Sequence, residues 1–399
     1  MGRIAEHILH VDMDAFFVEA ERLRDPSLVG VPVVVGGLGG RGVVASASYE
    51  ARRSGVRSAM PISEARRRVP LGRFVVPDHD HYRSISDSVF EILRSFTPIV
   101  EGLSIDEAFL EVAGLGLHYE GAHEIATAVR KAILSELNLP SSAGAATTKL
   151  VAKLASERSK PDGQLVVAAG SELDFLRPLG LRALWGVGEA TYAALEAIGV
   201  SAVGELADLP ERMVRRRLGE TIGAHLWALA HNMDDRAVTP GDGAKSISTE
   251  ATFAADLMDP SRIDEELFRL CVGLSDRLRK AGVAARTVSV KVRYSDFSTI
   301  TRSHTTTAPI DLAADLYATA SELTRRAGVG ERPVRLLGVA GTGLSDVGSP
   351  RQLGLGDDSR QALAEASDSV RHRFGEDAIR LARLVPPPDP ERSESPPVY

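Results

Sequence analysis

The sequence has a single cysteine and no long apolar run. Because Cys271 is alone among 399 residues, no disulfide can form within the chain and no multi-cysteine metal site is possible. No apolar stretch approaches the length that spans a bilayer, and the first residues lack the apolar core of a signal peptide. These features predict a cytoplasmic protein without a membrane segment.

The chain also has little excess charge. Its net charge of −7 argues against a general polyanion binder, but the charge is unevenly distributed. Residues 272–302 include seven basic residues and only two acids. A basic segment inside an acidic protein indicates a localised contact with nucleic acid.

Two extended segments carry acids that could meet in the fold. Asp12 ends an apolar run that begins at Ile8, and Asp106 and Glu107 lie within a second run, 99–112. If the two strands are neighbours, three carboxylates cluster at one sheet edge and need cations to neutralise them. Hard divalent ions with oxygen ligands suit such a cluster, and two Mg²⁺ ions could assist a phosphoryl transfer.

The adjacent pair of acids limits this interpretation. Neighbouring residues of a regular strand point to opposite faces, so Asp106 and Glu107 can share a site only at a bend or bulge. Glu101-Gly102 predicts a turn just before them. An ordinary solvated pair of acids is the alternative, because acids are common on protein surfaces.

The order of the expected elements in residues 1–170 indicates a ferredoxin-like fold. Strand, helix, strand, strand, helix and strand are expected at 7–13, 81–96, 99–102, 105–112, 122–137 and 142–146. This order would place Asp12 beside the hairpin that carries Asp106 and Glu107. A helix at 149–159 and a strand at 164–167 follow.

The rest of the chain divides into further segments. Residues 18–76 predict a small insertion of short elements, and 171–236 predict an all-helical segment. The stretch 237–247 is rich in proline and glycine and is typical of a linker. A second α+β domain is expected at 248–345, and one helix, 360–384, in the tail. The fold class is therefore α+β multidomain.

Cations and aromatic rings accompany the acids. Arg52 and Lys160 could balance the charge of a nucleoside triphosphate as pyrophosphate leaves, with Tyr49 donating a hydrogen bond. Surface residues with solvated head groups are the alternative. Phe16 and Phe17 are either core aromatics, or one ring packs under a sugar and excludes a 2′-hydroxyl. Helix geometry allows only one of them to do so.

Two further motifs indicate contacts with partners. Gly186 and Gly188 lie between expected helices, where backbone N–H groups could approach a DNA phosphate, although Gly-x-Gly also occurs at helix C-termini. Gln352, Leu353 and Leu355 could dock in an apolar pocket of a partner or belong to an ordinary loop.

Together these motifs resemble those of the Y family of DNA polymerases, in the DNA polymerase IV (DinB) branch. The resemblance rests on HVDMDAFF at 10–17, YEARRSGV at 49–56, SIDEA at 104–108, KPDG at 160–163, KSISTEATF at 245–253 and VRLLGV at 334–339. It implies a palm at 1–17 and 77–170, fingers at 18–76, a helix–hairpin–helix thumb at 171–236, a linker at 237–247, a little finger at 248–345 and a tail at 346–399.

The resemblance also assigns the acids. Asp12, Asp106 and Glu107 would be the catalytic residues: the first two would hold two Mg²⁺ ions, and the third would lie at the primer 3′-hydroxyl. The backbone carbonyl of Met13 would be a further ligand, Asp14 would not be one, and Mn²⁺ could replace Mg²⁺.

Other contacts follow from the same resemblance. Phe17 would discriminate the sugar, with Phe16 behind it. The incoming nucleotide would also meet Ser46, Tyr49, Arg52 and Lys160. DNA would meet Gly186, Gly188, Lys291, Arg293 and Arg302. A sliding clamp would meet Gln352, Leu353 and Leu355.

The implied enzyme is a monomeric, template-directed DNA polymerase of low fidelity that uses deoxynucleoside triphosphates in translesion synthesis, without a proofreading site. Two other functions compete with it. A nucleotide cyclase shares the ferredoxin-like fold and acid pair, but it needs no helical hairpin or basic second domain to hold a duplex. A non-catalytic DNA-binding or clamp-associated factor would not need all the acids and triphosphate contacts that the sequence retains.

Overall fold

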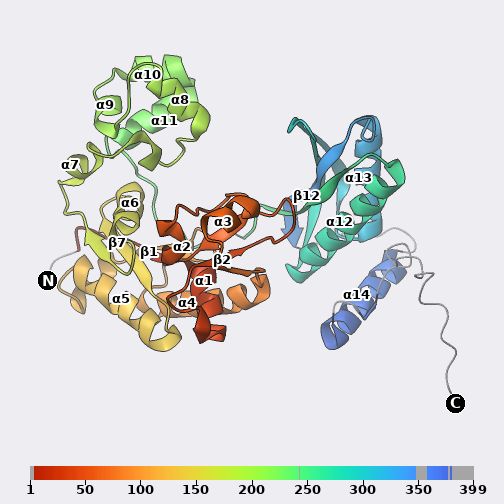
Figure 1. Ribbon diagram of the computed structural model, residues 1–399, viewed down its shortest axis with the longest axis horizontal. Coiled ribbons are helices and arrows are strands. Elements are labelled where there is room, and N and C mark those ends of the chain that lie inside the picture. Colours follow the sequence, from red (N-terminus) through yellow and green to blue (C-terminus); the bar gives the residue numbers. More distant parts are fainter. Residues whose placement is uncertain (1–3, 242, 347–356, 376–377, 380–399) are drawn as a thin grey trace. The chain divides into compact units, whose positions relative to one another are not determined.

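The computed structural model describes residues 4–241, 243–346, 357–375 and 378–379 (Figure 1). Contacts divide the chain into two compact units, Met1–Asp242 and Gly243–Tyr399, each described here by itself. Within the described ranges, no helix has the length and apolar character needed to cross a membrane.

A five-stranded sheet forms the centre of the first unit, in the order β5-β6-β1-β7-β8. The strands are β1 Ile8–Met13, β5 Val100–Gly102, β6 Glu107–Glu111, β7 Ser141–Ala146 and β8 Gln164–Val166. The middle strand, β1, is antiparallel to both β6 and β7, and β8 is parallel to β7. With α4 (His79–Phe96) and α5 (Ala122–Leu137), the strands β1, β5, β6 and β7 form the predicted ferredoxin-like arrangement.

The two faces of β1 have different surroundings. Leu9 and Val11 join an apolar core that includes residues of α4 and α5, whereas Ile8 joins the core on the side of α6 (Lys149–Ser159). Because side chains alternate along a strand, His10 and Asp12 share the α6 side with Ile8. The polar end of the strand is therefore covered by one helix.

Helix α6 lies close to the sheet because β7 has a glycine beneath it. A Cβ atom at Gly144 would be 2.2 Å from the carbonyl oxygen of Ala152 and 2.2 Å from the amide nitrogen of Ser156, both in α6. Any larger residue would force the helix and strand apart. The helix begins after Thr148, whose hydroxyl accepts a hydrogen bond from the amide of Val151.

Shorter elements complete the first unit. The insertion after β1 contains α1 Phe16–Arg24, β2 Val33–Gly36, β3 Val44–Ala47, α2 Tyr49–Arg53, α3 Ile62–Arg68 and β4 Arg73–Val75. The strands form a sheet of order β3-β2-β4 with its own small apolar core. The helical segment contains α7 Glu172–Leu176, α8 Glu189–Glu196, α9 Val203–Ala207, α10 Glu211–Leu218 and α11 Glu220–Ala230. Its core is continuous with that of α6, and 3-10 helices lie at Pro26–Leu28, Ala113–Leu117 and Leu181–Ala183.

The second unit consists of a four-stranded antiparallel sheet and two helices that share one apolar core. The elements are β9 Ser246–Leu257, α12 Pro260–Lys280, β10 Val283–Tyr294, β11 Thr299–Ile310, α13 Ala313–Arg326 and β12 Val334–Asp346, and the sheet order is β11-β10-β12-β9. Apolar residues of both helices and of alternate strand positions form one core. The second α+β domain expected from the sequence is therefore confirmed as a fold.

Two boundaries differ from expectation. Strand β9 begins at Ser246, inside the stretch expected to be a linker, because it pairs with β12 as far as Thr342. The tail helix α14 is Asp357–Phe374, so it begins and ends earlier than expected. Gly375 follows it with a φ of 96°, a left-handed conformation that ends a helix.

Candidate active site

A pocket of about 390 Å³ lies where β1 ends and β6 begins. Its lining includes Asp12, Met13, Phe16, Phe17, Ser46, Arg52, Asp106, Glu107 and Lys160. These are all the predicted catalytic residues and all the predicted nucleotide contacts except Tyr49. Residues from five separate segments of sequence are thus brought to one cavity.

The two strands deliver the acids in different ways. Asp12 is opposite Glu107 in the register of β1 and β6, so their side chains start from the same face. Asp106 lies before β6, in a bend at residues 103–106. The turn expected at Glu101-Gly102 was wrong, because both residues belong to β5. The later bend is what allows the two adjacent acids to line the same pocket.

Lys160 neutralises Asp12. Its Nζ atom is 2.8 Å from Oδ2 of Asp12 and 3.0 Å from Oε2 of Glu157. Burial raises the pKa of Asp12 to about 6, the Lys160 charge opposes this shift, and the charges of Asp106 and Glu107 reinforce it. A further cation beside Asp12 would stabilise the charged form of this buried carboxylate.

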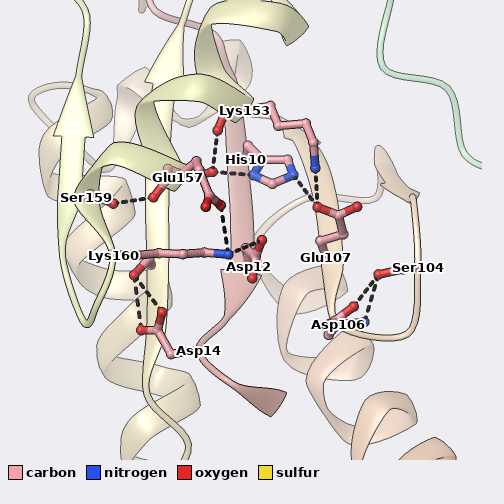
Figure 2. A network of polar contacts seen from close by, with 12 residues as sticks. His10, Asp12, Asp14, Ser104, Asp106, Glu107, Lys153, Glu157, Ser159 and Lys160 are labelled. Atoms are coloured by element: carbon pink, nitrogen blue, oxygen red, sulfur yellow. Dashed lines mark hydrogen bonds and ion pairs between the residues drawn. The ribbon is translucent and has the colours of Figure 1, made fainter. Parts of the chain in front are cut away.

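Glu107 turns toward α6 instead (Figure 2). Its carboxylate forms an ion pair with Lys153 and lies 3.4 Å from Nε2 of His10. Burial favours the neutral form of Glu107, but the contacts with His10 and Lys153 outweigh burial and lower its pKa to about 2. The carboxylate is therefore charged, and the ammonium of Lys153 balances it.

His10 is a buried, neutral imidazole. Burial lowers its pKa to about 4. Its Nδ1 atom is 2.6 Å from Oγ of Ser156, whose hydroxyl donates to the backbone carbonyl of Lys153 at 2.8 Å. Nε2 faces Glu107 without a hydrogen-bond partner.

Polar residues follow one face of α6 as far as its C-cap, Lys160, and the sequence reasoning identified only Lys160 among them. Lys149 pairs with Glu101 of β5, Lys153 pairs with Glu107, and Ser156 meets His10. Positions 149, 153, 156 and 160 follow one another at intervals of four, three and four, which is the spacing of one helix face. That spacing was the available signal.

Asp14 is a buried anchor and does not line the pocket. Its carboxylate accepts hydrogen bonds from Oη of Tyr49 at 2.8 Å, from Oγ of Ser142 at 3.0 Å and from the amide of Asp162 at 2.7 Å. The single phenolic proton of Tyr49 is therefore used inside the protein. Burial and the Asp14 charge both raise the pKa of Tyr49.

The remaining pocket residues have defined surroundings. Phe16 is only 2% exposed and belongs to the core, whereas Phe17 is half-buried and stacks on Tyr82 with ring centroids 4.4 Å apart. Arg52 donates from Nε to the carbonyl of Ala47 at 2.9 Å. Its guanidinium carbon lies 4.8 Å from the ring centre of Tyr49.

The predicted DNA contacts do not all share one surface. In β10, Lys291 and Arg293 alternate with buried residues and so point away from the helices. Arg302 is opposite the buried Val290 in the register of β10 and β11, which places it on the other face of the sheet. Gly186 has a φ of 98°, and Gly188 immediately precedes α8.

The predicted clamp contacts Gln352, Leu353 and Leu355 lie outside the described residues.

The oxygen atoms that line the pocket suit a hard divalent cation, although the acidic side chains do not converge on one point. In the part of the chain that the structure describes, no three His, Cys, Asp or Glu side chains are arranged to hold a metal. Asp12, Asp106 and the backbone of Met13 nevertheless line one pocket and offer oxygen ligands only. Glu107 could join them by turning away from Lys153.

Comparisons with known proteins agree with this fold and pocket. Residues 11–157 match the impB/mucB/samB family, and residues 244–355 match the C-terminal domain of the same family. DNA polymerase IV of Desulfatibacillum aliphaticivorans is 42% identical over 383 residues, which are 95% of this chain and 96% of the relative. DNA polymerase IV of Streptomyces coelicolor is 44% identical over 346 residues, or 86% and 72% of the two chains.

Solved structures show the same architecture. A Y-family DNA polymerase chimera superposes with a TM-score of 0.78 at 25% identity, covering 84% of this chain and 98% of the chimera. DinB from Sulfolobus solfataricus gives a TM-score of 0.60 with the same identity and coverage. The fold class is that of the Y-family polymerases. Within that class, the chain belongs to the impB/mucB/samB family, together with the DNA polymerase IV relatives it matches.

The different surroundings of two aspartates lead to a prediction about stability. Asp14→Asn removes a buried charge that accepts three hydrogen bonds, so we expect it to lower the free energy of unfolding by about 2 kcal/mol. Asp106 pairs only with nearby Ser104, and Asp106→Asn should change stability by less than about 0.5 kcal/mol. Denaturant unfolding of both variants measures the difference, and equal midpoints would show that Asp14 is not an anchor.

Proposed function

We propose that this chain is a template-directed DNA polymerase of low fidelity that acts in translesion synthesis. It adds deoxynucleotides to a primer 3′-hydroxyl by phosphoryl transfer. The observation that carries the proposal is the single pocket that unites three acids, two cationic side chains and the Phe16–Phe17 pair. Membership of the family supports the same reaction.

The acids are proposed to hold divalent cations. Asp12 and Asp106 would be ligands, with the backbone carbonyl of Met13 completing the set and Glu107 as the third acid beside the primer terminus. All these donors are oxygens, which favours Mg²⁺ and allows Mn²⁺. When bound, two such ions stabilise the attacking and leaving oxygens of the transfer.

Arg52 and Lys160 are proposed to bind the triphosphate. Both cations line the pocket, and Ser46 lies in the same wall. Their charges would offset the charge that develops as pyrophosphate leaves. The hydroxyl of Tyr49 donates a hydrogen bond to Asp14, so it is not available to the triphosphate. We therefore assign Tyr49 an indirect role, in which its ring supports the Arg52 guanidinium.

Phe17 is proposed to discriminate against ribonucleotides. Its ring is fixed by stacking on Tyr82 and lines the pocket, whereas Phe16 is buried behind it. A ring held in place by packing can exclude a 2′-hydroxyl by contact alone.

The surfaces for DNA are proposed to lie outside the pocket. Backbone amides near Gly186 and Gly188 would meet a phosphate, and Lys291 and Arg293 would do so from their shared face. Arg302 lies on the opposite face of the sheet, so its side chain would have to reach around the sheet edge to contact the same DNA. The palm, fingers, thumb, linker, little finger and tail ranges stated above belong to the same proposal, with the boundary between linker and little finger moved to Ser246. So do a sliding-clamp contact through Gln352, Leu353 and Leu355, the monomeric state and the cytoplasmic location.

Asp106→Ala separates catalysis from DNA binding. We expect primer extension with Mg²⁺ and four deoxynucleotides to fall by at least about 10³-fold, because a metal ligand is lost. Primer–template affinity should change little, since the proposed DNA contacts lie elsewhere. Loss of DNA binding as well would contradict this separation of roles, and nucleotide consumption without DNA would indicate a cyclase-like enzyme.

Phe17→Ala tests the sugar contact. Without the ring, the pocket gains room for a 2′-hydroxyl, so we expect the preference for deoxynucleotides to fall by about tenfold or more. The ratio of kcat/KM for a deoxynucleotide and its ribonucleotide measures the effect. Tyr82→Phe keeps the stacked ring and removes only a hydroxyl, so it serves as the control with an unchanged ratio. An unchanged ratio in Phe17→Ala would remove Phe17 from this role.

A further inference from the structure

Glu107 is the predicted metal-site acid that forms an ion pair with Lys153 of α6. Asp12 pairs with Lys160 and Asp106 with Ser104, whereas Glu107 pairs with Lys153 (Figure 2). His10 lies beside it without a hydrogen bond from Nε2. Lys153 is therefore the cation that balances Glu107.

Lys153 also borders a second pocket, of about 550 Å³, between α6 and residues 179–187. Trp185 and Arg182 line this pocket as well. Nζ of Lys153 lies 5.9 Å from the ring centre of Trp185, and the lysine side chain is 30% exposed. Because the side chain of lysine is long and flexible, its ammonium can swing from Glu107 into this pocket without movement of the backbone.

A lysine and a divalent cation compete for the same carboxylate. With Lys153 in place, a metal ion at Glu107 would meet a like charge only a few ångströms away, which is unfavourable in a partly buried site. The metal site can be completed only if Lys153 leaves, and its ammonium then requires another anion.

We propose that Lys153 blocks Glu107 until a primer arrives. The inference rests on the proposed function, which places the primer 3′-hydroxyl at Glu107. The phosphodiester of the terminal primer nucleotide would then enter the pocket of Lys153 and Trp185 and bind the ammonium. Glu107 is released by this exchange and turns toward Asp12 and Asp106. Lys153 is thus a positioning residue that makes metal binding depend on the primer.

The exchange couples two binding equilibria. If primer binding removes Lys153 from Glu107 and so favours the metal, then the metal must favour the primer by the same factor. The coupling should appear without any nucleotide and without turnover.

The test is Mn²⁺ binding by the full chain, measured from the free-ion electron spin resonance signal. We expect DNA-free Lys153→Met to bind Mn²⁺ at least about tenfold more tightly than wild type, because the competing charge is gone. A primer–template with a dideoxy terminus should tighten binding by wild type by a similar factor and have little effect on Lys153→Met. Lys153→Arg, which keeps the charge, should remain weak without DNA.

Lys149→Met is the matched control. Lys149 lies one helical turn before Lys153 on the same face, but it pairs with Glu101, which does not line the acid pocket. Its loss removes the same charge from the protein without freeing Glu107, so DNA-free Mn²⁺ affinity should not change. Thermal unfolding of the variants checks that each retains its fold.

Two results would overturn the inference. One is an unchanged DNA-free Mn²⁺ affinity in Lys153→Met, and the other is an equal gain in Lys149→Met. If either occurs while wild type still extends primers, only the block by Lys153 is wrong. If wild type does not extend primers at all, the proposed function itself has failed.

Discussion

The close packing of α6 against the sheet is the contact on which the pocket depends. Three carboxylates at the end of neighbouring strands repel one another, and the fold must offset that repulsion before any ligand binds. Helix α6 does so by placing Lys153 and the following Lys160 over Glu107 and Asp12. Gly144 permits the approach, because a side chain there would collide with the backbone of the helix.

Patterns with a regular period could be read from the sequence alone. The helices at Ala122–Leu137 and Lys149–Ser159 were predicted with these same limits, since helical spacing of apolar residues is a local signal. The meeting of Asp12 with the β5–β6 hairpin followed from the ferredoxin-like order of elements. The fold class is of this kind, whereas the roles of most pocket residues came from the resemblance of their motifs to the Y family.

Choices among partners could not be read in this way, because they depend on tertiary distances. Nothing local indicates that Glu107 pairs with Lys153, or that Tyr49 donates to Asp14. The face of Arg302 is set by the register of β10 with β11, which a single strand does not encode. The bend at 103–106 was misplaced for a similar reason, since β5 extends through Gly102 by pairing with β6.

The most direct measurement is the anomalous scattering of Mn²⁺ in crystals of the chain with a dideoxy-terminated primer–template and an incoming nucleotide. The account predicts two Mn²⁺ peaks between Asp12 and Asp106, with Glu107 turned toward them and Lys153 against the primer backbone. A complex that holds primer and nucleotide but has its Mn²⁺ peaks away from these carboxylates would contradict it.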